Sequence, residues 1–279
     1  MIALTSEVAG PRLRGTAVSL MYCGVPLGAA LAAMIGIADL TGGWQVVFYV
    51  GGVVPLLIVP LLGLYLPESQ QFRNAQGETP VGVVQGLFRD GAALPTALIW
   101  VSYFFTLMVV YILINWLPSL VIGQGFTGRQ ASWVMLALQI GAAIGTLFLG
   151  WVMDRLPAWA LSVLIYLGIL VSLSALGLAS HLPGMLAAGF IAGFFATGGQ
   201  CVLYALAPHF YRPSIRATGV GSAVAIGRLG AMSGPLVAGK MLALGTGTAG
   251  VMLASAPGIV IAAVAMFYLS VRRNAAAPD

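Results

Sequence analysis

The chain has 279 residues, of which 60% are hydrophobic and only 7% charged, and its mean hydropathy is +1.01. Soluble domains carry about 25% charged residues, so this composition excludes a soluble protein and predicts an all-α polytopic protein of the lipid bilayer. The net charge of +5 comes from basic residues spread over short turns, which argues against a nucleic-acid partner.

Eight apolar stretches are long enough to span a bilayer core of about 30 Å. They cover residues 16–37, 46–66, 94–117, 131–153, 159–178, 183–206, 217–242 and 250–269. A polar segment, 67–91, separates the first two stretches from the other six. Its mixture of charges, Gly, Gln and Pro predicts a linker at the membrane surface.

The basic residues lie mostly on one side of this array. That side collects Arg12, Arg14, Arg73, Arg89, Arg155, Arg212, Arg216, Arg272 and Arg273, and the other only Arg129 and Lys240. The positive-inside rule then places both termini and the 67–91 linker in the cytoplasm.

One internal repeat organises the chain. The segment 11–18 (PRLRGTAV) resembles 213–220 (PSIRATGV), and 27–29 matches 229–231, with every pair 202 residues apart (213 minus 11, and 229 minus 27). Two parallel halves give such a pattern in transporters. We expect residues 1–66 to be the last two helices of the first half and 92–279 to be a six-helix second half. The first four helices of such a protein would then be absent from this chain.

The predicted helix 217–242 carries a charge, Arg228, near its middle. An arginine at the bilayer centre costs about 3 kcal/mol or more and normally pairs with an acidic residue. Every Asp and Glu lies outside the predicted spans or at a helix end. Two interpretations stay open: Arg228 binds a substrate carboxylate through paired N–H···O bonds, or it is structural and pairs with another helix.

Further polar residues inside the spans are candidates for the same site. Tyr111 and Asn115 are four apart on one helix, Gln200 and Tyr204 share a face of another, and Gln139 stands among small apolar residues. With Arg228 they would supply a carboxylate clamp, hydrogen-bond partners and aromatic walls. The alternative is interhelical hydrogen bonding, worth about 0.6 kcal/mol each.

The turn after residue 153 contains a charged pair, Asp154 and Arg155. One interpretation is a gate in which Asp154 meets basic residues or a helix N-terminus in one conformation, with Arg14 and Arg216 as partners from equivalent turns. The alternative is a polar turn, with the arginines acting as positive-inside anchors.

Several glycines have the spacing of close helix contacts. These are Gly141 with Gly145, and Gly189 with Gly193. Gly230 and Gly234, followed by Pro235, are expected to let the arginine helix bend.

Short motifs in the sequence resemble a known family. They include Gly150-x-x-x-Asp154-Arg155, Leu66-Pro67-Glu68-Ser69, Asn115-Trp116-Leu117-Pro118 and Gly227-Arg228-Leu229-Gly230-Ala231. The chain resembles the major facilitator superfamily, and within it the aromatic acid:proton symporters. The resemblance implies a twelve-helix bundle of which this chain matches the fifth to twelfth helices. It also implies that the helices carrying the candidate site residues line a cavity, and it favours the gate.

The expected function is proton-coupled symport of an aromatic carboxylate, such as 3-(3-hydroxyphenyl)propionate, across a bacterial inner membrane. The alternative is a truncated, non-transporting remnant or a half-transporter that needs another chain. An enzyme would need paired carboxylates or a His cluster at membrane depth. We therefore expect no catalytic residues, no metal and no cofactor.

Overall fold

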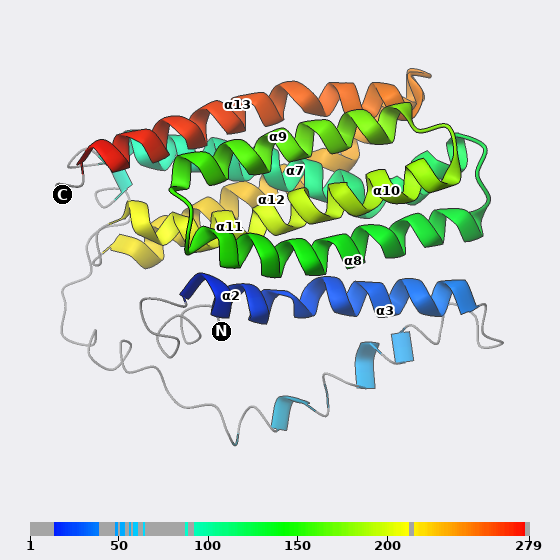
Figure 1. The fold of residues 1–279 in the computed structure, drawn as a ribbon, viewed down its shortest axis with the longest axis horizontal. Coiled ribbons are helices and arrows are strands. Elements are labelled where there is room, and N and C mark those ends of the chain that lie inside the picture. The colour runs from blue at the N-terminus through cyan, green and yellow to red at the C-terminus, as the bar shows by residue number, and fades with distance from the viewer. Residues whose placement is uncertain are drawn as a thin grey trace.

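A computed structural model of the chain describes residues 14–38, 48–49, 51–53, 56, 58–60, 64, 87–88, 92–211 and 215–276. The described elements form a bundle of helices that run roughly along one axis (Figure 1). In chain order they are α2 (Arg14–Tyr22), α3 (Gly24–Ala38), α7 (Ala93–Gly123), α8 (Gly128–Met153), α9 (Ala158–Leu178), α10 (Leu182–Ala192), the π-helix η2 (Gly193–Thr197), α11 (Gly198–Leu206), the 3₁₀-helix η3 (Ala207–Phe210), α12 (Arg216–Ala243) and α13 (Gly247–Ala276).

Six helices are long and apolar enough to cross a membrane, and they coincide with the last six predicted spans. They are Ala93–Gly123, Gly128–Met153, Ala158–Leu178, Leu182–Phe210, Thr218–Ala243 and Gly247–Arg272. The predicted span 16–37 is present as two helices, α2 and α3, with a turn at Cys23. Most of the predicted span 46–66, and nearly all of the linker 67–91, lie outside the described residues.

The helix ends follow from local sequence signals. Thr127 caps α8 by accepting a hydrogen bond from the Gln130 backbone, while the Gln130 side chain accepts from the Thr127 backbone. His181 caps α10 through Nδ1, which accepts from the backbone of Gly184 at 2.9 Å. Gly125, with φ of 93°, and Gly245, with φ of 73°, adopt the left-handed conformation in the turns that follow α7 and α12.

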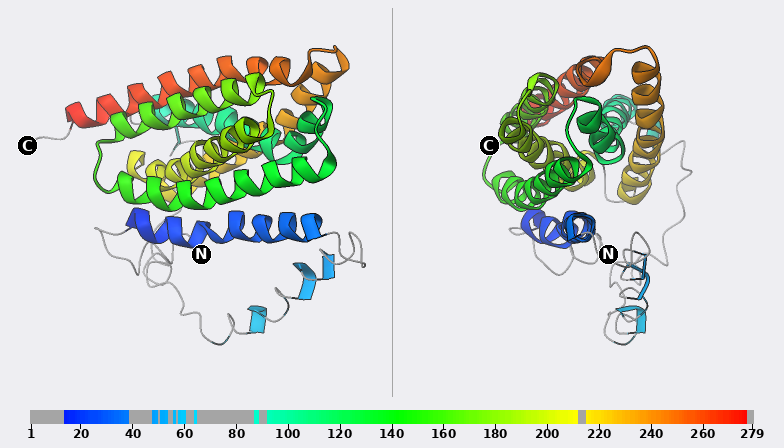
Figure 2. Two further views of the ribbon diagram at one scale, coloured as in Figure 1. Left: turned by 45° about the vertical axis from the view of Figure 1, so that its right-hand side comes forward. Right: turned by 90° about the vertical axis from the view of Figure 1, so that its right-hand side faces the viewer.

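The bundle is arranged around α7, which contacts α8, α11, α12 and α13. Seen along the bundle, α12 lies at the edge and packs chiefly on α7 (Figure 2). Helices α2 and α3 lie along α8 on another side of the bundle (Figure 1), and α2 also reaches α11. The α2–α3 segment and α12, which carry the two copies of the repeat, therefore lie on different sides of the bundle.

The predicted close contacts of glycines are confirmed between α8 and α10. A Cβ added at Gly141 would overlap the Phe190 carbonyl oxygen, and one at Gly193 would overlap the Leu138 carbonyl oxygen. The two backbones therefore approach more closely than any larger residue allows. The π turn η2 begins at Gly193, where this approach occurs, and α11 starts after it. Such turns widen a helix locally and often occur at functional sites.

Candidate functional site

Arg228 is held in place by Tyr111. Its Nη1 donates a hydrogen bond to the Tyr111 hydroxyl, and its guanidinium carbon lies 5.9 Å from the centroid of the Tyr111 ring. The two residues come from the middle of α12 and of α7, the pair of helices that pack most extensively. An uncharged phenol thus orients the guanidinium and leaves its charge uncompensated.

A line of glycines on α12 makes this reach possible. A Cβ at Gly230 would overlap the Phe104 carbonyl oxygen, and one at Gly234 would lie 2.5 Å from the Met108 carbonyl oxygen. The expectation that these two residues let the helix bend stays a prediction, and the structure also gives them a contact role against α7. Trp100 also joins α7 to α12, because its Nε1 donates a hydrogen bond to Ser222 Oγ at 3.0 Å. The close backbones bring Arg228 within reach of Tyr111.

Arg228 has no acidic partner among the six spanning helices, because none of them contains Asp or Glu. Its side chain is exposed in the part of the chain that the structure describes. A guanidinium that keeps its remaining donors free and lies near the middle of a membrane helix is suited to a carboxylate, which accepts two parallel hydrogen bonds.

Asn115, one helical turn beyond Tyr111, is also exposed. Its Nδ2 donates to the Tyr111 backbone carbonyl at 2.8 Å, so the amide is turned back onto its own helix. Tyr111 therefore connects Arg228 on α12 with Asn115 on α7. Asn115 itself makes no hydrogen bond to Arg228 within the described residues.

A second polar group lies on α11. Gln200 Nε2 donates to the Tyr204 hydroxyl at 3.0 Å, and both side chains are buried. The Tyr204 ring lies between Tyr22 of α2, at 5.3 Å between centroids, and Tyr103 of α7, at 5.5 Å. Tyr103 is itself fixed, since its hydroxyl donates to the Leu203 carbonyl at 3.0 Å. Three helices thus meet around Tyr204.

Gln139 is not joined to these groups by a hydrogen bond within the described residues. It is buried on α8 with 5% of its surface exposed, and its side chain makes no hydrogen bond within the described residues. Its membership of the site stays a prediction.

The predicted gate residue Asp154 contacts a residue of the first-half segment. Asp154 follows the last residue of α8, and its Oδ2 accepts a hydrogen bond from Thr16 Oγ1 at 2.8 Å. Thr16 lies in the first turn of α2, where the helix dipole favours a negative charge. The carboxylate therefore lies beside a helix N-terminus, and a gating role for this contact stays a prediction.

Two cysteine side chains make further contacts between the α2 region and the neighbouring helices. Ser19 Oγ and Cys201 Sγ of α11 are 3.6 Å apart, and Cys23 Sγ donates to the Ala143 carbonyl of α8 at 3.6 Å. Both cysteines are free and buried. We call the contacts of Thr16, Ser19 and Cys23 with α8 and α11 the α2 seam.

The other predicted gate residues are not joined to Asp154 within the described part of the chain. Arg155 folds back onto α8, with its guanidinium carbon 3.6 Å from the centroid of the Trp151 ring and Nη1 donating to the Trp151 carbonyl at 3.2 Å. The side chains of Arg14 and Arg216 lie outside the described residues. Their gating role stays a prediction.

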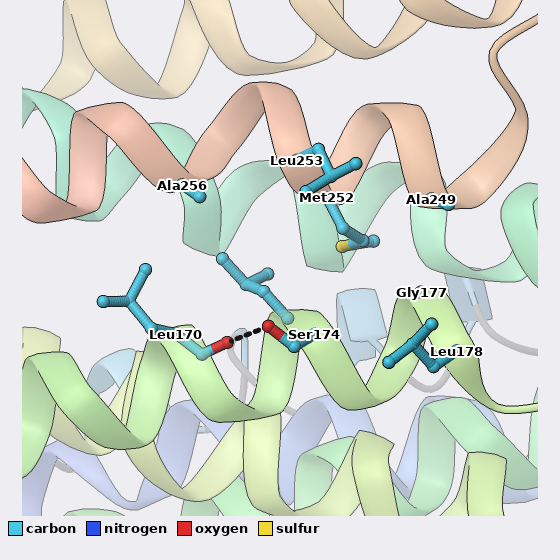
Figure 3. A pocket seen from close by; sticks show the side chains of 9 residues that line it. Leu170, Ser174, Gly177, Leu178, Ala249, Met252, Leu253 and Ala256 are labelled. Carbon is cyan, nitrogen blue, oxygen red and sulfur yellow. Dashed lines mark hydrogen bonds between the residues drawn. The ribbon is translucent and has the colours of Figure 1, made fainter.

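An apolar cavity of about 170 Å³ lies elsewhere, between α9 and α13 (Figure 3). Its one hydroxyl, that of Ser174, donates to the Leu170 carbonyl and so presents no free donor. This cavity contains none of the predicted site residues and offers no group for a carboxylate.

Sequence reasoning missed Thr16, Ser19, Tyr22 and Cys23. Thr16, Ser19 and Tyr22 are three residues apart and Cys23 follows Ser19 by four, which places their side chains toward one face of this segment, and that spacing is the signal that would have found them. The prediction instead concentrated on the second half of the chain, where Arg228 lies.

A family model of the Major Facilitator Superfamily matches residues 1–182 and, in a second alignment, residues 99–279. This chain belongs to the major facilitator superfamily. The predicted all-α bundle of this type is therefore confirmed, and the chain is a membrane-spanning protein with the candidate site among its helices.

Among the relatives in this superfamily, the chain is 63% identical over 278 residues to the 3-(3-hydroxy-phenyl)propionate transporter of Escherichia coli (strain K12), covering 100% of this chain and 68% of that protein. It is 32% identical to the gallate transporter of Pseudomonas putida, covering 88% of this chain and 61% of that protein. It is 30% identical to the 4-hydroxybenzoate transporter PcaK of Pseudomonas putida, covering 87% and 61%. The predicted resemblance to aromatic acid transporters is confirmed, and the chain spans about two thirds of the length of these relatives.

A solved structure has the same fold. A bacterial homologue of the human lysosomal transporter Spinster, in an inward-facing and unoccupied conformation, matches with a TM-score of 0.66 over 93% of this chain and 71% of that chain. At 21% sequence identity, this likeness supports the major facilitator fold alone.

Proposed function

We propose that this chain functions as, or within, a secondary active transporter that carries an aromatic carboxylate such as 3-(3-hydroxyphenyl)propionate. The single observation that carries the proposal is the exposed guanidinium of Arg228, oriented by Tyr111 and without a carboxylate partner on the six spanning helices. The names of the relatives, which are transporters of aromatic acids, supply the substrate class. No catalytic step forms part of the proposal.

In this proposal Arg228 binds the substrate carboxylate, and Tyr111 keeps the guanidinium plane turned toward it. Charge-assisted hydrogen bonds contribute about 1.5–3 kcal/mol each, so removal of Arg228 would weaken binding by one to two orders of magnitude or more. Aromatic residues near the site, such as Tyr22 and Tyr204, would contact the ring of the substrate.

We further propose that the α2 seam closes one end of the substrate site. The hydrogen bond between Asp154 and Thr16, at the N-terminus of α2, can be exchanged for hydrogen bonds to water at modest cost, because both groups are at an exposed end of the bundle. Arg155, Arg14 and Arg216 would engage in the conformation in which this contact is broken. The distribution of arginines supports a cytoplasmic position for this end and for both termini.

Protons are the coupling ion in this proposal, and the bacterial inner membrane is the location. Both rest on the resemblance to aromatic acid:proton symporters and on the bacterial relatives. Since the six spanning helices contain no Asp or Glu, we infer that no carboxylate side chain of these helices carries the proton. A protonophore should then abolish accumulation of substrate without changing its affinity.

The test is uptake of labelled 3-(3-hydroxyphenyl)propionate by cells that lack their own carrier. Three proteins are compared: this chain, its Arg228→Ala variant, and this chain fused behind the first third of the Escherichia coli relative. Uptake by the chain that is lost in Arg228→Ala supports transport by the chain itself. Uptake by the fusion alone supports the alternative, in which the chain needs further helices. Absence of uptake by both the chain and the fusion would contradict the proposal.

A further inference from the structure

We propose that Gln200 and Tyr204 form a second pole of the substrate site, which recognises a hydroxyl group on the aromatic ring, and that Tyr22 of α2 forms a wall of this pole. The inference rests on the proposed function and deepens it, because it assigns the part of the site that distinguishes a hydroxylated acid from a plain one.

The Gln200 amide has an unused acceptor. Its Nε2 donates to the Tyr204 hydroxyl at 3.0 Å, while no donor reaches its Oε1 within the described part of the chain. Gln200 is 94% buried, with 6% of its surface exposed. The oxygen itself is not fully enclosed, so a hydrogen-bond donor of a ligand can reach it. A phenolic hydroxyl is a donor of the required kind.

The hydrogen bond between Gln200 and Tyr204 does not fasten two helices together. Both residues lie on α11, one helical turn apart. The simplest structural role for a polar pair inside a membrane protein is to bridge neighbouring helices. Tyr204 contributes to such a bridge, because it also interacts with Tyr22 of α2. The Gln200 oxygen does not contribute to it and is available for a ligand.

The position of this pole relative to Arg228 suits one substrate molecule. Along α7, Tyr103 packs on Tyr204 and Tyr111 binds Arg228. These two tyrosines are eight residues apart, which corresponds to about 12 Å along a helix. A molecule that has a phenyl ring with a hydroxyl at one end and a short carboxyalkyl chain at the other, together with its hydrogen bonds of about 2.8 Å, has a length of the same order.

Tyr22 covers the ring-binding part of the site from α2. Its ring packs on Tyr204, with 5.3 Å between the ring centroids. Because Tyr22 comes from α2 and the other residues from α7, α11 and α12, the ring of the substrate would be enclosed by both segments of the repeat. Loss of this side chain would remove apolar contact area, which every aromatic acid uses.

The test is isothermal titration of the purified chain with 3-(3-hydroxyphenyl)propionate and with 3-phenylpropionate, which lacks the ring hydroxyl. The wild-type protein should bind the hydroxylated acid roughly fivefold to tenfold more tightly, as expected for one neutral hydrogen bond. Gln200→Met, which keeps the size of the side chain, should reduce this ratio to about one by weakening the hydroxylated acid alone. Tyr22→Leu should weaken both acids by the same factor.

Tyr166→Phe is the matched control, because it removes a buried tyrosine hydroxyl that is bonded to Thr106 and not to the site. It should leave the ratio unchanged. If Gln200→Met does not fold, Gln200→Leu serves as the second variant. A wild-type ratio near one, or an unchanged ratio in the Gln200 variants, overturns this inference while leaving the proposed function intact. If neither the wild-type chain nor its fusion to the first third of the Escherichia coli relative binds either acid, the proposed function fails, and this inference with it.

Discussion

Tyr111 accepts a hydrogen bond from Arg228, so an uncharged residue of α7 fixes the orientation of a charged residue of α12. A salt bridge would neutralise the guanidinium and compete with a substrate carboxylate. A phenol does neither, because it occupies one donor and leaves the others free. This relationship favours the proposal that Arg228 binds the substrate carboxylate over a purely structural role.

Replacement of Tyr111 by Phe should weaken the binding of aromatic carboxylates about threefold to tenfold, since one hydrogen bond that orients the guanidinium is lost. The effect should be the same for benzoate and for longer acids, because the carboxylate is common to all of them. Competition against a labelled acid measures both affinities. An effect confined to one ring type would show instead that Tyr111 contacts the ring.

Replacement of Gly230 by Ala should separate α12 from α7, because the new Cβ would overlap the Phe104 carbonyl oxygen. Overpacking of this kind costs about 1–3 kcal/mol, and it also moves Arg228 away from Tyr111. We expect a lower thermal midpoint in detergent together with weaker binding. Gly221→Ala on the same helix is the matched control, since a Cβ there has no atom within 4 Å. Equal effects of the two variants would contradict the contact role of Gly230.

Replacement of Asp154 by Ala, or of Thr16 by Val, should open the α2 seam, since each removes one partner of the same hydrogen bond. The two cysteines report this opening, because both are buried at the seam. We expect faster alkylation of Cys23 and Cys201 by a maleimide in either variant, and no further increase in the double variant, as for a single shared interaction.

Ser132→Ala is the control for the seam, because the Ser132 hydroxyl is exposed on α8 and donates to the Gly128 carbonyl of its own helix. Its alkylation rate should equal that of the wild type. If Asp154→Ala leaves both cysteines as slow to react as in the wild type, the Thr16–Asp154 contact does not hold the seam closed.

The spans were predictable from the sequence because the length of an apolar run is a property of the local chain. The prediction 159–178 differs from α9, Ala158–Leu178, by one residue at its start, because Pro157 marks that boundary. The break at Cys23 was not predicted, although Gly24 and Pro26 follow it directly and a proline at position 26 has no N–H to donate to the Tyr22 carbonyl. The π turn at Gly193 depends on how closely α8 approaches, and no local pattern encodes that distance.

The site was predictable in its residue types and less so in its contacts. Arg228 was evident because a lone charge in an apolar helix is conspicuous, and Tyr111 because it follows the helical period with Asn115. That Tyr111 is the partner of Arg228 depends on the glycine contacts between α12 and α7, which are tertiary. The Thr16–Asp154 hydrogen bond joins residues 138 positions apart and has no signature in the local sequence.

The most direct test of the central claim compares a carboxylate with its neutral amide. Titration of the purified chain with 3-(3-hydroxyphenyl)propionate and with 3-(3-hydroxyphenyl)propionamide, each repeated on Arg228→Gln, isolates the interaction between the guanidinium and the carboxylate. The account predicts that the wild type prefers the acid by at least about tenfold, as expected for a charge-assisted hydrogen bond, and that Arg228→Gln loses this preference. Equal preference for the acid in the wild type and in Arg228→Gln would contradict the assignment of Arg228 as the carboxylate-binding residue.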